Sequence, residues 1–367
     1  MNQLVTATIL LLFAPIFASA EGTGPKVYGL INKEIRSVSQ DKDSNKKSSP
    51  QVTDVDGFET RLGATGTEKL EHFDVTYKIE LGLNSNKDTS DESRIRMRLA
   101  YVSLQKDFGN IVIGQNWTPN SVRMIKLDPL TATGLQNYSL DQGFVNGKNA
   151  GAGGLGFRMR YFVDQLTYAT PNFSGFQYQI TYDTNDTSAS FDKTSGTPPS
   201  ADNKTYLSHV LTYDKMFGEW GINLTGTYSQ ASHEKQISTH QEKFWTVANK
   251  LIISNFELGM AYGIQSTGDK GDNTRMFVSG KYKFNNYDFA VTYGNLDVED
   301  GTTGVKTGSD NMIATGAIYH YSKDFSMRLL LGRYGVKKET AADFDGDGQT
   351  EKENSAKIIT VGTTINF

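Results

Sequence analysis

The chain has 367 residues, with 37 lysines and arginines against 41 aspartates and glutamates, for a formal net charge of -4. This small charge, with acidic and basic residues interleaved, argues against a nucleic-acid partner. There is no cysteine, which excludes disulfides, thiolate metal sites and cysteine nucleophiles. With 36 glycines, 18 tyrosines and 20 phenylalanines against 8 prolines, the composition favours β-strands and tight turns.

Residues 1–20 have the pattern of a secretory signal peptide. The apolar run from Leu4 to Phe17 is too short to cross a membrane as a helix, and the small residues Ala18 and Ala20 precede Glu21. No later apolar run is long enough for such a helix. We therefore expect cleavage after Ala20, export, and a single domain over residues 21–367.

From Lys26 onward, segments of about ten to fifteen residues alternate apolar and polar side chains, as in the strands of an antiparallel up-and-down barrel. The apolar positions of the two clearest segments are Val75, Tyr77, Ile79 and Leu81, and Ile95, Met97, Leu99 and Tyr101. The polar positions between them are Thr76, Lys78 and Glu80, and Arg94, Arg96 and Arg98. Each segment thus has one oily and one charged face.

Short and long links join these segments in turn. The short ones combine turn residues with an aromatic and lie at 107–110, 172–175, 217–220, 254–256, 284–287 and 321–325. Aromatic rings at strand ends are typical of the girdle at a membrane surface. The alternative, rings that plug the end of a soluble barrel, explains one or two such turns and not all of them.

Counting the segments between links predicts an all-β transmembrane barrel of about sixteen strands. The last segment, 357–367, directs Ile359, Val361, Thr363, Ile365 and Phe367 to one face. About eight strands already close on a packed core, so a barrel of this size encloses water unless part of the chain folds into it.

One long link is suited to that role. Residues 117–156 form a loop of about forty residues, and a link of this length inside a compact domain is usually functional. Its aliphatic and aromatic residues provide material for packing, so we expect an inward-folded third surface loop. A surface loop without fixed structure is the alternative.

Several motifs resemble the Gram-negative general, non-specific porin family. They are Val27-Tyr28-Gly29-Leu30, the stretch 61–68 with its Arg-Leu-Gly and Gly-Thr-Glu, the stretch 98–115 with its Asp-Phe-Gly turn and Ile-Gly-Gln, and the terminal Phe367. The resemblance covers the mature chain. It implies a homotrimer of sixteen-stranded barrels in the outer membrane, in contact with lipid and lipopolysaccharide. Each pore would be narrowed by the third loop and would pass small hydrophilic solutes and ions by passive diffusion.

The sequence departs from the family in two places. The family's acidic Pro-Glu-Phe-Gly-Gly-Asp stretch in the constriction loop is absent, and Leu30 replaces a frequent lysine. Both departures leave the ion selectivity open.

We expect a transverse electric field at the constriction. Its proposed basic side is Arg61, Arg94, Arg96 and Arg98, and its acidic side is Asp128 and Asp141. The excess of arginine suggests a slight anion preference. The alternative is that some of these arginines only pair with Glu59, Glu68 or Glu80 on neighbouring strands.

A weak calcium loop is the one candidate metal site. Asp343, Asp345 and Asp347 alternate as in the first half of such a loop, but its twelfth position is Asn354 instead of glutamate. A solvated acidic loop is the alternative, and no other cofactor is indicated.

The sequence shows no catalytic constellation, so we predict that the chain is not an enzyme. The glycine-rich stretch 151–156 matches a dinucleotide fingerprint only formally, because no helix pattern follows it. A substrate-specific channel and an adhesive barrel remain as alternatives to a general diffusion pore.

Overall fold

The computed structural model describes residues 23–40, 50–54, 60–83, 95–130, 162–183, 204–233, 243–266, 272–299, 306–342 and 351–367. The predicted signal segment, 1–20, lies outside them. Among the described residues, no helix is long and apolar enough to cross a membrane.

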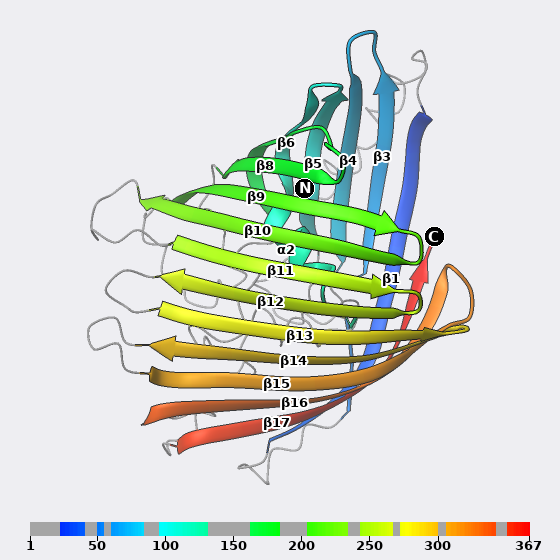
Figure 1. The fold of residues 1–367 in the computed structure, drawn as a ribbon. Helices are drawn as coiled ribbons and strands as arrows, with labels where there is room; N and C mark the ends of the chain where they lie inside the picture. The colour runs from blue at the N-terminus through cyan, green and yellow to red at the C-terminus, as the bar shows by residue number, and fades with distance from the viewer. Residues whose placement is uncertain are drawn as a thin grey trace, which may run out of the picture.

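The described chain is a closed antiparallel barrel (Figure 1). Its strands are β1 (Thr23–Gln40), β2 (Gln51–Asp54), β3 (Arg61–Lys69), β4 (Asp74–Leu83), β5 (Ile95–Lys106), β6 (Gly109–Trp117), β7 (Phe162–Ala169), β8 (Phe176–Asp183), β9 (Lys204–Phe217), β10 (Trp220–His233), β11 (Lys243–Ile253), β12 (Phe256–Ser266), β13 (Asp272–Phe284), β14 (Tyr287–Glu299), β15 (Lys306–His320), β16 (Phe325–Ala342) and β17 (Glu351–Asn366). The first strand pairs with the last, so the sheet closes on itself.

Two of these segments form one strand of the barrel. Both β2 and β3 pair with β1. The pairing with β3 ends where Leu30 lies opposite Arg61, and the pairing with β2 begins where Lys33 lies opposite Asp54. They lie in line along the same edge. The barrel therefore has sixteen strands, which confirms the predicted number.

The two faces of the wall have opposite character. On β14, Val291 and Tyr293 are 46% and 40% exposed, whereas Thr292 between them is 1% exposed. On β7, Leu166 is exposed and Thr167 is buried. Apolar side chains thus point outward and polar ones toward the lumen, which is the inverse of a soluble barrel.

All six aromatic short links are confirmed as turns between paired strands, and residues 70–73 form a seventh. Rings from adjacent strands pack against each other at this end of the barrel, hereafter the turn end. The ring centroids are 4.3 Å apart for Phe217 and Trp220 and 4.8 Å apart for Tyr287 and Tyr319. The predicted aromatic girdle is therefore present.

The predicted face of Leu99 and Tyr101 is wrong. The pairing of β4 with β5 shifts register between Glu80 and Leu81, which leaves Arg98 as an extra residue in β5. Such a β-bulge reverses the alternation that follows it. Ile95 and Met97 point outward, whereas Arg98 and Leu99 are both buried on the lumenal side and Val102 becomes the exposed residue.

Candidate pore constriction

The third long link enters the barrel through a short helix. The helix α2 (Pro119–Ile125) begins where β6 ends, and the hydroxyl of Thr118 caps it by accepting the Ser121 amide proton. Figure 1 shows α2 between the two walls of the barrel. The structure describes this link through Leu130, and the rest of the predicted loop lies outside the described residues.

Polar contacts hold α2 and the residues after it to the inner wall at β9 and β13. Arg123 pairs with Asp214 of β9 at 2.5 Å and donates to the Thr212 hydroxyl at 3.2 Å. Further along, the carbonyl oxygen of Leu127 accepts the Ser279 hydroxyl proton at 2.6 Å. The link is thus anchored to β9 and β13 after it leaves β6.

Apolar packing adds to this anchoring. Met124, Leu127 and Leu130 belong to a buried cluster with Phe277 and other inward residues of β11 to β17. The backbone of Leu127 approaches Gly259 so closely that a Cβ atom there would lie 2.9 Å from the Leu127 oxygen. A glycine is therefore needed in β12 where the link crosses it.

Lys126 follows α2 and adds a positive charge to this link. Its carbonyl oxygen accepts a hydrogen bond from the Lys250 ammonium at 3.3 Å. Desolvation against the wall lowers the pKa of the Lys126 side chain, and the neighbouring Arg123 charge lowers it further.

A first basic cluster surrounds Glu80 on the wall of β1 to β5. Arg98 donates to the Glu80 carboxylate at 2.7 Å, Tyr28 donates at 2.8 Å, and Arg61 lies 3.8 Å away. The Arg98 side chain has no exposed surface, and its guanidinium carbon lies 5.7 Å from the Trp117 ring centroid. Two arginines thus share one carboxylate.

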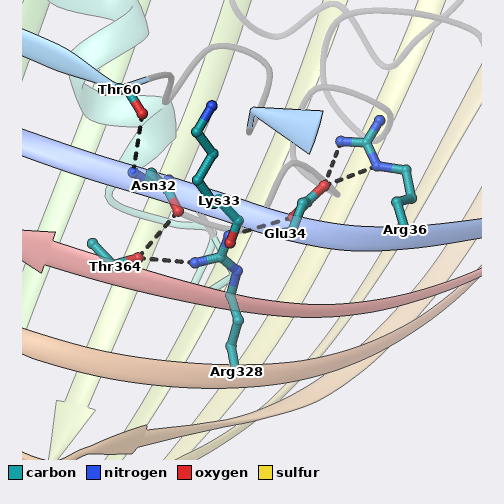
Figure 2. Close-up of polar contacts among 7 residues, drawn as sticks. All are labelled: Asn32, Lys33, Glu34, Arg36, Thr60, Arg328 and Thr364. Atoms are coloured by element: carbon teal, nitrogen blue, oxygen red, sulfur yellow. Dashed lines mark hydrogen bonds and ion pairs between the residues drawn. The ribbon is translucent and has the colours of Figure 1, made fainter. Parts of the chain in front are cut away.

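A second basic cluster surrounds Glu34 where the barrel closes (Figure 2). Arg36 donates to this carboxylate from the same strand, at 2.8 Å from its Nε. Arg328 of β16 reaches across β17 to the same carboxylate at 3.4 Å and to the Thr364 hydroxyl at 2.8 Å. Asn32 accepts the Thr364 proton, so three strands are joined by one network.

A third basic cluster surrounds Glu257 near the turn end. Lys281 and Lys283 lie 2.9 Å and 2.8 Å from the carboxylate, and Lys250 contacts its other oxygen. Each of the three clusters therefore carries more positive than negative charge.

The structure brings together part of the predicted constriction. Arg61 and Arg98 meet at Glu80, the pairing considered as an alternative from the sequence, and Arg96 lies opposite Gly82 on the same wall. Asp128 is buried and accepts the Leu130 amide proton at 2.9 Å. Arg94 and Asp141 lie outside the described residues, so the constriction as a set stays a prediction.

The predicted calcium ligands, Asp343, Asp345 and Asp347, also lie outside the described residues. Within the described ranges, no group of three histidine, aspartate or glutamate residues is placed to hold a metal ion.

Sequence reasoning missed α2 and the clusters at Glu34 and Glu257. The helix has a readable signal, because Thr118 followed by Pro119 is a typical N-cap and first helical position. Lys281 and Lys283 also alternate on one face. The link from Glu34 to Arg328 leaves no such local signal, because these residues meet only when the barrel closes.

Comparison with known proteins agrees with this architecture. The model of the Gram-negative porin family matches residues 6–339. The chain belongs to this family. No curated protein sequence matches the chain significantly.

Solved structures share the fold at low identity. An anion-selective porin from Comamonas acidovorans is 16% identical, with a TM-score of 0.68 over 94% of this chain and 100% of that one. The outer-membrane channel DcaP of Acinetobacter baumannii is 16% identical, with a TM-score of 0.62 over 96% and 99%. OmpF of Salmonella typhi, solved with daunomycin, is 14% identical, with a TM-score of 0.63 over 94% and 98%.

Family and fold together make the chain an outer-membrane channel for the passive diffusion of small solutes. The fold fits this function, because its inner wall is polar and its outer wall is apolar.

Proposed function

We propose that this porin prefers anions over cations. The observation that carries the proposal is that Glu34, Glu80 and Glu257, three carboxylates on the inner wall, are each contacted by two or three basic side chains. Fixed charges of one sign on low-dielectric walls raise the local concentration of the opposite ion. An excess of lysine and arginine therefore favours anions in the lumen.

The arginines of β3 and β5 are the proposed basic side of the constriction. Arg61 is 21% exposed, so its charge reaches the lumen directly, whereas the fully buried Arg98 holds Glu80 in place. The carboxylate of Asp128 is engaged by the Leu130 amide. We propose that this one described carboxylate of the acidic side is outweighed by the two arginines, which leaves a positive potential.

We also propose that the porin assembles as a homotrimer. One solved relative, OmpT of Vibrio cholerae, is described as a trimer.

Liposome swelling tests the proposal with solutes matched in size. Proteoliposomes should admit small sugars, and should admit a singly charged anion faster than a cation of the same size. Equal rates for the two ions, or faster entry of the cation, would refute the anion preference. Exclusion of the sugars would refute the diffusion pore itself.

A further inference from the structure

The lysine cluster, defined as Lys250, Lys281 and Lys283, places three ammonium groups on the single carboxylate of Glu257. Lys281 and Lys283 share one oxygen of Glu257, at 2.9 Å and 2.8 Å, and Lys250 contacts the other. One carboxylate offsets one of these charges. The remaining ammonium groups repel each other at close range, which costs stability unless a further anion is present.

The lysine cluster faces the lumen. On β12, Phe256 and Leu258 are exposed outward at 58% and 43%, so Glu257 between them points inward. On β13, Tyr282 is the outward residue, so Lys281 and Lys283 on either side of it also point inward. Three adjacent strands thus deliver their charges to one patch of the inner wall.

Donors for another anion remain in this patch. An ammonium group carries three N–H donors, and Glu257 is the one carboxylate that contacts Lys281 and Lys283 within the described residues. Asp288, opposite Lys283 in the register and 3.3 Å from His320, adds a second negative charge beside Lys283, so three ammonium groups face two carboxylates. Lys283 is 50% exposed, so a solute in the lumen can reach it.

The patch is also joined to the constriction. Lys250 donates to the carbonyl of Lys126, directly after α2. Arg123, one helical turn before Lys126, is held on this side of the lumen by its ion pair with Asp214. An anion that passes the constriction toward the turn end therefore meets the lysine cluster next.

We propose that the lysine cluster is a binding station for small oxyanions of more than one negative charge, of which inorganic phosphate is the test case. Such an ion accepts hydrogen bonds from Lys281 and Lys283 together and neutralises the positive charge that Glu257 and Asp288 leave. The station rests on the proposed anion preference and adds to it a saturable site. If strand anchoring were the only role of the cluster, one lysine would suffice.

The test is single-channel recording of the full-length purified porin in potassium chloride, with increasing potassium phosphate on both sides. Phosphate should reduce the chloride current along a saturating curve. In the variant K281Q, the half-saturating phosphate concentration should rise about tenfold, the loss expected for one charge-assisted hydrogen bond. K283Q should behave alike, and K281R should retain most of the block.

The matched control is K215Q. Lys215 is exposed near the turn end of β9, where its ammonium lies 5.6 Å from the Phe217 ring, so this variant loses the same charge outside the lumen. Its phosphate curve should equal that of the unmodified porin. Circular dichroism and heat-dependent gel mobility confirm that each variant is a folded barrel.

The outcomes separate the station from the anion preference. A chloride current that falls in proportion to phosphate without saturating, or an unchanged half-saturation in folded K281Q and K283Q, overturns the station and leaves the preference standing. Cation preference in the unmodified porin overturns both.

Discussion

The guanidinium group of Arg328 lies against the backbone of Gly362, where the last strand of the barrel meets the first. A Cβ atom at residue 362 would lie 2.6 Å from the guanidinium carbon. The side chain of Arg328 thus depends on this glycine to cross β17 and reach Glu34. The closing seam of the barrel is held by a contact that any larger residue would block.

We predict that Gly362→Ala destabilises the barrel by about 1–3 kcal/mol, because Arg328 must leave Glu34 and Thr364 and the buried carboxylate loses a partner. The midpoint of urea unfolding in lipid vesicles, followed by tryptophan fluorescence, measures this. Gly226→Ala is the control, since a Cβ there meets nothing within 4 Å. Equal midpoints for the two variants would contradict the seam as described.

The pair of Glu80 and Arg98 allows a prediction about buried charge. Glu80→Ala should cost about 3–5 kcal/mol, because the unexposed Arg98 loses its nearest counter-charge. Glu80→Met combined with Arg98→Met should be much closer to the unmodified porin, since no buried charge remains unpaired. The same unfolding assay decides this, and a double variant as unstable as the single one would show that the ion pair is not the cause.

The strands and turns could be predicted from the sequence because their signals are local. The alternation around Leu166 and Thr167, and the aromatic beside each short turn, can be read within a few residues. The bulge at Arg98 could not be read, because it appears only in the register against Glu80 and Leu81. Glu34 and Arg328 are 294 residues apart, so their contact depends on closure of the whole barrel.

The residues of the candidate constriction likewise differ in whether the sequence around them carries a local signal. Arg61 and Arg98 could be placed on a basic wall from their strand pattern, but their shared partner Glu80 depends on pairing between strands. The anchoring of α2 by Asp214 was beyond prediction, because it joins α2 to a residue of β9 that is 91 positions away in the sequence.

The contact of Arg123 with Asp214 should hold the constriction link in place. Arg123→Gln removes one ion pair, which at a partly exposed site weakens the anchoring by about 1 kcal/mol. We expect larger open-channel current fluctuations than in the unmodified porin, measured in a planar bilayer. Asp214→Asn should give the same result, and the two changes combined should add little. Current fluctuations equal to those of the unmodified porin in both single variants would show that other contacts hold the link in place.

The close approach of Leu127 to Gly259 should also control the link. Gly259→Ala would place a Cβ atom 2.6 Å from the Ser279 hydroxyl oxygen and 2.9 Å from the Leu127 carbonyl oxygen. The backbone must move away from β12, so we expect a changed single-channel conductance. Gly280→Ala is the control, because its nearest atom would lie 3.7 Å away. A conductance that changes equally in both variants would argue against this contact.

The most direct test of the anion preference is the reversal potential of the unmodified porin in a planar bilayer under a potassium chloride gradient. We predict ohmic openings whose reversal potential has the sign of chloride selectivity. The shift should shrink when Lys281 and Arg61 are replaced together by glutamine. A reversal potential with the sign of potassium selectivity would contradict the account of the lumenal charges. The absence of channel openings from protein that is folded would contradict the open pore.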